Sequence, residues 1–271
     1  MLKLSSLLIT PVFLAGCATP IPDFVLPKDV RNVAISLVES SLKTESFMGA
    51  QAKYLVRATG NLGIVWKYDH AIQANVTADG LTDDLTESIP DGRPLTKITA
   101  RSLSVCGLIP LLTESVEGGL PGQLVFIPAN KSVNVGSYGG AQPTINRLRI
   151  NYLKTDTKDI CNPVADKTYS FQIRGHMESA SIMPVGTIRR VDELDETTTC
   201  KTESVSADLK YLEQHGATLL LKCTHKSNQF RPIESKYVYL TKAGRYLKVL
   251  SQYSASADNK FEYSPLKYIA K

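Results

Sequence analysis

The sequence predicts a mainly β fold, an α+β chain whose antiparallel strands form sheets, a sandwich or a barrel after one N-terminal helix. Runs of β-branched and aromatic residues recur from residue 53 to the C-terminus, separated by turn-forming segments. Several of these runs alternate apolar and polar side chains, as strands with one buried face do. A single stretch, residues 29–42, has helical spacing instead. A loop through residues 155–167 divides the chain into an expected α+β lobe, residues 30–158, and a β lobe, residues 159–271.

The expected helix carries one apolar stripe, because its apolar residues recur at steps of three and four. Those residues are Val30, Val33, Ala34, Leu37 and Val38. We expect this stripe to pack against the core. The segment before it, residues 17–29, contains three prolines, which fix φ and remove backbone donors. It therefore predicts an extended tether.

Strand candidates in the first lobe are residues 53–58, 64–68, 100–106, 123–127 and 144–153. In the last of these, Leu148, Ile150 and Tyr152 alternate with polar neighbours, as in a half-buried strand. Residues 79–94 are rich in Asp, Gly and Pro and predict a surface loop.

The second lobe has strand candidates at residues 169–173, 187–191, 217–223, 261–263 and 268–269. Its clearest feature is a hairpin whose strands, 236–241 and 245–251, flank Lys242-Ala243-Gly244. Gly244 adopts a positive φ without strain, as a hairpin with a bulge requires. The alternation places Val238 and Leu240 on one face and the intervening tyrosines on the other.

Composition limits the classes of function. Apolar residues make up 43% of the chain, enough for a real core and too many for a disordered protein. The formal charge of +5 comes from 31 basic and 26 acidic residues spread along the whole length. This charge is too small and too diffuse to favour nucleic acid as a partner.

The first residues predict an export signal. Lys3 precedes an apolar run, residues 4–14, of about 11 residues, which is too short to span a bilayer as a helix, since that takes about 20 residues. We therefore expect residues 1–16 to be a signal peptide. The residues that follow the run, Leu14-Ala15-Gly16-Cys17, resemble the lipobox of bacterial lipoproteins. An ordinary signal peptide with a coincidental cysteine is the alternative.

The resemblance implies that Cys17 is diacylated on sulfur, freed by signal peptidase II and then N-acylated, with palmitate-type chains. Two or three acyl chains hold a protein on a membrane almost irreversibly. Ala18, where inner-membrane lipoproteins carry Asp, implies the outer membrane as the destination. The expected location is thus the outer membrane, lipid-anchored and facing the periplasm.

Four cysteines remain, Cys106, Cys161, Cys200 and Cys223. An even number in an oxidising compartment predicts two disulfides, and three pairings are open. Cys200 and Cys223 flank a segment that ends in the strand-like run 217–223, which favours that pair and leaves Cys106 with Cys161. The spacings contain no Cys-x₂₋₄-Cys unit, so no metal site is predicted.

The chain lacks the common catalytic motifs, such as Gly-x-Ser-x-Gly and His-Glu-x-x-His. No catalytic residue and no cofactor is therefore assigned, and whether the protein is an enzyme stays open. Asp192, Glu193, Asp195 and Glu196 cluster before Cys200 and predict a solvated acidic loop. His176 and His215 have no local partner for catalysis or metal binding.

Six of the 12 tyrosines lie from Tyr237 onward. Because tyrosine is enriched at interfaces, Tyr237, Tyr239 and Tyr246 are candidates for contact with an envelope protein. A β-sheet that simply favours tyrosine is the alternative. The predicted function is a non-catalytic binding or scaffolding component of an envelope or secretion assembly. The alternatives are a hydrolase acting on peptidoglycan or polysaccharide, and a carrier of lipid or sugar.

Overall fold

Alternating apolar and polar residues along most of the chain produce long antiparallel strands, here seen in a computed structural model. The structure describes residues 25–39, 46–58, 65–90, 98–117, 144–183, 186–254, 257–263 and 266–269. The expected signal peptide, Cys17, most of the tether and the expected strand 123–127 lie outside these residues.

The described residues contain the helix α1 (Lys28–Val38), the 3-10 helix η3 (Ala207–His215) and thirteen strands. The strands are β1 (Ser46–Ala58), β2 (Val65–Val76), β3 (Thr82–Pro90), β4 (Ile98–Val105), β5 (Ile109–Glu117), β6 (Thr144–Thr155), β7 (Thr168–Met183), β8 (Gly186–Glu203), β9 (Ala217–Ser227), β10 (Ile233–Leu240), β11 (Arg245–Ser254), β12 (Ala257–Tyr263) and β13 (Leu266–Ile269).

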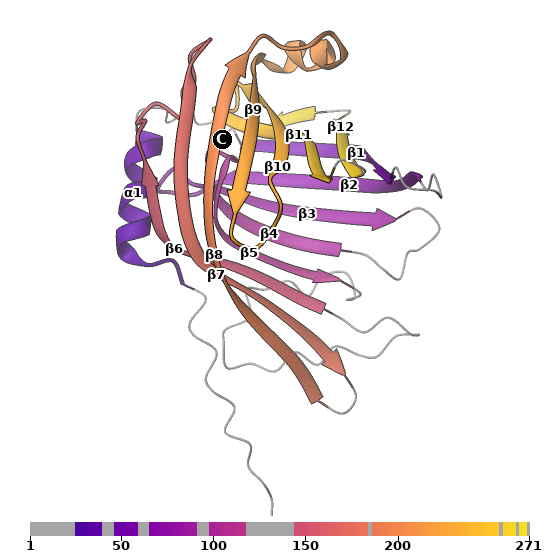
Figure 1. Ribbon diagram of the computed structural model, residues 1–271. Coiled ribbons are helices and arrows are strands. Elements are labelled where there is room, and N and C mark those ends of the chain that lie inside the picture. Colours follow the sequence, from indigo (N-terminus) through magenta and orange to yellow (C-terminus); the bar gives the residue numbers. More distant parts are fainter. Residues whose placement is uncertain are drawn as a thin grey trace, which may run out of the picture.

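All thirteen strands belong to one antiparallel sheet in which each strand from β1 to β12 pairs with the next in sequence. The sheet curls until its ends meet, because β12 also pairs with residues 52–58 of β1. β13 pairs with residues 46–49 of the same strand. In Figure 1, β8, β9 and β10 pass in front of β1–β5, so the curled sheet has an inner face.

The prediction of a mainly β, antiparallel fold with an N-terminal helix is confirmed. The expected boundary between residues 158 and 159 lies in the connection between β6 and β7, which pair with each other, so the sheet is continuous across it. The prediction of a surface loop at residues 79–94 is wrong, because residues 82–90 form β3. Hydrogen bonds to β2 and β4 on both sides outweigh the low strand propensity of its Asp and Pro residues.

The helix α1 lies beside β6 at the left of Figure 1. It buries Val30, Ala34, Leu37 and Val38, which are four of the five residues of the predicted stripe. Arg31 on its outer side forms an ion pair with Asp79 in the turn between β2 and β3. The predicted amphipathic helix is confirmed as far as Val38, and the sheet provides the surface that its apolar stripe covers.

The largest apolar cluster of the described residues joins α1 to side chains of the curled sheet. It includes Leu81, Ile109, Tyr169, Tyr239 and Tyr246, all of which are nearly inaccessible to solvent. A second cluster packs Leu209 and Leu212 of η3 with residues of β9, β10 and β11 that include Val238 and Leu240. The two clusters receive alternate residues of β10, as the alternation in the sequence predicts.

Both predicted disulfides are present. Cys106 is bonded to Cys161, and Cys200 to Cys223. The second bond joins directly opposed residues of β8 and β9 and so fixes the register of these two strands. Neither helix in the described part of the chain has the length and apolar run that crossing a bilayer requires.

Candidate functional site in the curled sheet

A cavity of about 380 Å³ lies inside the curled sheet. This volume falls in the range of small-molecule sites, roughly 300 to 1,000 Å³. Its walls come from strands far apart in sequence, β3 to β5 on one side and β7 to β11 on the other. The lining residues are Asp84, Ser102, Ser104, Gly107, Leu108, Pro110, Thr113, Phe171, Glu196, His225, Ile233, Ser235, Tyr237, Lys248 and Ser251.

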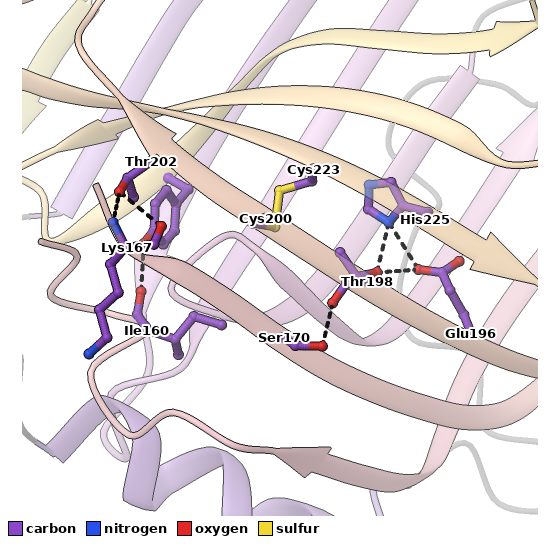
Figure 2. Close-up of a disulfide and its surroundings, with 10 residues drawn as sticks. Ile160, Lys167, Ser170, Glu196, Thr198, Cys200, Thr202, Cys223 and His225 are labelled. Atoms are coloured by element: carbon purple, nitrogen blue, oxygen red, sulfur yellow. Dashed lines mark hydrogen bonds and ion pairs between the residues drawn. A yellow bond between two sulfur atoms is a disulfide. The ribbon is translucent and has the colours of Figure 1, made fainter. Parts of the chain in front are cut away.

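Three polar side chains from two neighbouring strands meet at one wall of the cavity. Glu196 and Thr198 are two residues apart on β8 and therefore share a face. Thr198 is directly opposite His225 on β9. The Thr198 hydroxyl donates to Glu196 Oε1 (3.0 Å), and His225 Nδ1 lies 2.9 Å from the hydroxyl and 3.1 Å from that carboxylate oxygen. Figure 2 shows the three side chains converging beside the disulfide.

This arrangement determines which ring nitrogen of His225 carries the proton and which one has a free lone pair. An ionised carboxylate only accepts hydrogen bonds, so Nδ1 carries the proton in the neutral ring. Burial raises the pKa of Glu196, but the hydrogen bonds from His225 and Thr198 and the charge of Lys248 outweigh it and leave the pKa below its usual value. Nε2 is then an acceptor, and it is buried with no hydrogen-bond partner in the described part of the chain.

A second polar atom of the cavity is also buried without a partner. Ser104 on β4 is only 5% exposed, and its Oγ makes no hydrogen bond with any described residue. Ser102, two residues earlier on the same strand, differs because its hydroxyl lies 3.1 Å from that of Thr113 on β5. Buried polar groups without partners are rare in proteins, so two of them lining one cavity make it a candidate binding site.

A tight turn and an ion pair border the cavity, since Gly107 and Asp84 are among its lining residues. Cys106 and Gly107 both have positive φ, 44° and 76°, as the two central residues of a type I′ turn require, and Leu108 N donates to Val105 O across this turn. A side chain at residue 107 would meet the Tyr246 carbonyl oxygen at 2.5 Å, so only glycine allows the turn to approach β11 this closely. Beside it, Arg245 donates two hydrogen bonds, 2.6 and 2.7 Å long, to the carboxylate of Asp84.

The charged side chains of the cavity are opposite in sign. The charge of Arg245 faces that of Asp84, and Lys248 and Glu196 line the same cavity. Among the described residues, no group of three His, Cys, Asp or Glu side chains is arranged to hold a metal ion. The arrangement therefore favours an uncharged ligand that offers several hydrogen-bonding groups.

A second, smaller cavity of about 280 Å³ lies further along the sheet. Its lining residues are Thr113, Ser115, Asn146, Arg147, Leu148, Met177, Glu178, Ser179, Asp192 and Phe230. Thr113 lines both cavities. Phe230, in the loop between β9 and β10, is half exposed.

The structure places the three predicted interface tyrosines inside the sheet. Tyr237, Tyr239 and Tyr246 are only 3%, 2% and 0% exposed, so their rings form part of the core and offer no surface to a protein partner. Tyr239 and Tyr246 pack against each other with ring centres 5.0 Å apart. The sequence shows the face that these residues share but not that this face is the inner one.

The acidic cluster is also placed differently from the prediction of a solvated loop. Its residues belong to β8, where Asp192 pairs with Arg190, Asp195 pairs with Arg174, and Glu196 turns inward to His225. His176 and His215 lie away from the cavity lining. The prediction missed the role of Glu196 and His225, although each is within four residues of a cysteine of the predicted Cys200–Cys223 bond.

Comparisons with family models, characterised proteins and solved structures find no match for this chain. The site must therefore be interpreted from its own chemistry.

Proposed function

We propose that this protein is a lipid-anchored envelope lipoprotein that binds a small, uncharged, polyhydroxyl ligand of the sugar class in the larger cavity. The observation that carries the proposal is the pair of buried, unpartnered atoms, Ser104 Oγ and His225 Nε2, in one cavity. A hydroxyl of the ligand donates to the lone pair of Nε2, and another exchanges a hydrogen bond with the serine.

The rest of the lining supports a sugar over a lipid. Serine and threonine hydroxyls come from several strands. A lipid chain would leave the buried Ser104 Oγ without a partner. Phe171 and Tyr237 line the same cavity and contribute apolar area against which the C–H groups of a sugar ring pack. The charged side chains at the cavity occur as Arg245 with Asp84 and Lys248 with Glu196. A neutral ligand adds no further charge that would need a counter-charge.

The anchoring part of the proposal depends on the lipobox-like residues Leu14 to Cys17. Replacing Cys17 by Ala removes the sulfur that would be acylated. We expect the variant to accumulate as an unprocessed precursor that takes up no labelled fatty acid, while the unaltered protein is labelled. Normal labelling of the Cys17→Ala protein would refute the anchor.

Ligand binding is tested with the full-length lipoprotein in mild detergent, titrated calorimetrically with neutral mono- and disaccharides. Thr198→Val removes the hydroxyl that holds Glu196 and His225 together, and should weaken binding about tenfold, the effect of losing one or two hydrogen bonds. The matched control is Thr199→Val, since Thr199 is the next residue on β8 and is exposed. If no saccharide binds, or if both variants behave alike, the proposal fails.

A hydrolase is the second candidate, because a histidine oriented by a carboxylate is a suitable general base. His225 Nε2 has no nucleophilic side chain within hydrogen-bonding distance among the described residues, so a water molecule would be the nucleophile. Incubating the protein with the saccharides that bind and analysing the products distinguishes the two candidates. Released reducing ends that disappear in the His225→Gln variant would favour the hydrolase.

A further inference from the structure

The two cavities are neighbours on the same face of the sheet. Ser102 is opposite Thr113, Thr113 is opposite Leu148, and Leu148 is opposite Met177. Directly opposed residues of paired strands point to the same face, so these four side chains cross β4, β5, β6 and β7 in one row. The row begins at the larger cavity with Ser102 and ends at the smaller one with Met177.

The loop between β9 and β10 borders both cavities. At its base, His225 and Ile233 are opposed residues that line the larger cavity. Its tip carries Phe230, which lines the smaller one. This loop therefore connects the two cavities along one side, while Thr113 connects them along the floor.

Hydrogen bonds to the backbone of β8 hold this loop in place. Asn228 Nδ2 and Gln229 Nε2 donate to the carbonyl oxygen of Glu193, at 3.0 and 2.6 Å. The backbone nitrogen of Asp195 donates to Asn228 Oδ1 at 2.8 Å. The position of Phe230 at the edge of the cavity is thus fixed by its neighbours, although its own ring is 50% exposed. Such a fixed, exposed aromatic ring is available to stack on a ligand.

Like the larger cavity, the smaller one combines apolar area with several hydrogen-bonding side chains. Ser115, Asn146 and Ser179 contribute hydroxyl and amide groups to its lining. Its charged residues are again neutralised, since Arg147 pairs with Glu114 (2.6 Å), Arg189 with Glu178 (2.7 Å) and Arg190 with Asp192 (2.7 Å). A neutral polyhydroxyl compound fits both cavities by the same chemistry.

We infer that the ligand is a linear, neutral oligosaccharide that occupies both cavities, an inference that depends on the proposed sugar-binding function. One sugar unit lies against His225 and Ser104, and the following units cross Thr113 and reach the ring of Phe230. Strands are about 4.8 Å apart, so the row from β4 to β7 spans roughly 15 Å, more than a single sugar ring covers. The two ends of the site thus contact different units of one chain.

The test measures affinity against ligand length, with malto-oligosaccharides and chito-oligosaccharides from the monosaccharide to the pentasaccharide as probes. The full-length lipoprotein in mild detergent is titrated with each compound. In one of the two series, we expect the Kd to fall by about tenfold or more between the monosaccharide and the longer members, because an additional aromatic contact forms. The Kd should then become constant once the chain fills both cavities.

Variants in the two cavities test the two-cavity inference independently of the proposed sugar-binding function. Phe230→Ala should weaken binding of the longer chains by about five- to tenfold and leave the monosaccharide unchanged, because only the longer chains reach the ring. Phe230→Tyr keeps the ring and should restore binding of the long chains. His225→Gln should weaken binding at every length, since each ligand contacts the deep end.

Each possible outcome supports or overturns one of the two proposals. If no sugar of either series binds, the proposed function itself is wrong. If monosaccharides bind but longer chains bind no better, the proposed function stands and the two-cavity inference is overturned. The inference is also overturned if Phe230→Ala weakens the monosaccharide and the longer chains equally, because the ring would then not contact a separate unit.

Discussion

Two regions of the inner face differ in how completely their polar atoms are paired. In the closed end, defined here by Tyr239, Tyr246, Ile160 and Cys161, each buried tyrosine hydroxyl donates to a carbonyl oxygen. Tyr239 donates to Cys161 at 2.8 Å, and Tyr246 donates to Ile160 at 2.6 Å. In the larger cavity, Ser104 Oγ and His225 Nε2 are also buried, and neither has a partner in the described part of the chain.

Under the proposed function, the closed end maintains the fold and the larger cavity is kept for binding. A paired buried hydroxyl contributes about 1 kcal/mol to stability, whereas an unpaired one costs roughly 1 to 3 kcal/mol. Both regions are built on the same sheet, so the fold does not by itself require the unpaired atoms. Proteins commonly retain such locally unfavourable groups where function needs them.

The largest expected effect comes from the ion pair that borders both regions. Arg245→Ala leaves the buried carboxylate of Asp84 without its counter-charge, and should lower the free energy of unfolding by about 3 to 5 kcal/mol. Arg174→Ala is the matched control, because its pair with Asp195 is half exposed, and should cost less than about 1 kcal/mol. Urea denaturation of both variants measures the difference, and equal losses would contradict this assignment.

Removing each disulfide compares the two regions directly. The Cys106–Cys161 bond closes a loop of 55 residues at the closed end, and the Cys200–Cys223 bond closes one of 23 residues beside the cavity. The chain-entropy model predicts losses of about 4 and about 3 kcal/mol for the respective double Ser variants. Only the second pair fixes the register that brings Thr198 opposite His225, so only its loss should also impair saccharide binding. If only the variant without the Cys106–Cys161 bond lost saccharide binding, this assignment of the two disulfides would be wrong.

The sequence predicts those elements of the fold whose stabilising residues lie close together along the chain. The hairpin of β10 and β11 is predicted because Gly244 and the alternation of its strands lie within a few residues of one another. β3 is not predicted, since what stabilises it comes from elsewhere in the chain. Arg101 on β4 donates two hydrogen bonds to Asp83, and Arg245 on β11 donates two to Asp84. These arginines neutralise the acidic side chains of a segment that pairs with β2 and β4 as a strand.

The site illustrates the same limit at a finer scale. Glu196 and Thr198 precede Cys200 by four and two residues, and His225 follows Cys223 by two. Once the second disulfide is accepted, antiparallel pairing alone places Thr198 opposite His225, so this wall of the cavity could have been predicted. The opposite wall could not, because Ser104 is brought to it only by the curling of the whole sheet. Local alternation also leaves open which face of a strand is buried.

The closed end should also respond to alkaline pH. Burial raises the pKa of Tyr239 to about 12, and burial together with the nearby Tyr169, Tyr239 and Asp159 raises the pKa of Tyr246 well above its ordinary value of 10.0. In the unfolded chain both tyrosines ionise near their ordinary value, so the unfolded state loses protons first as the pH rises. The stability that these groups contribute is therefore complete below pH 10 and is lost progressively toward pH 12 and above.

Tyr239→Phe checks this dependence. Denaturation between pH 9 and pH 12 should show a shallower fall in stability for this variant than for the unaltered protein. Tyr152→Phe, at a half-exposed position, should leave the slope unchanged. If the slopes of all three proteins coincide, the buried tyrosines do not control the alkaline transition.

The last comparison concerns the removal of a buried hydroxyl from each region. We expect its effect on stability to differ in sign between a paired hydroxyl and an unpaired one. Thr202, on the same face of β8 as Thr198, accepts from the backbone nitrogen of Lys167 at 2.8 Å and donates to Val164 O at 2.8 Å. Thr202→Val leaves those partners unpaired and should destabilise the protein by about 1 to 3 kcal/mol.

Ser104→Ala, by contrast, removes a buried hydroxyl that has no partner in the described part of the chain. It should leave the free energy of unfolding unchanged or raise it by up to about 1 kcal/mol, because the cost of burying that hydroxyl disappears. The same variant should bind saccharide more weakly, since the ligand loses a hydrogen bond. A clear loss of stability in the ligand-free Ser104→Ala protein would show that the hydroxyl is paired after all, and would remove one of the two atoms on which the proposed site depends.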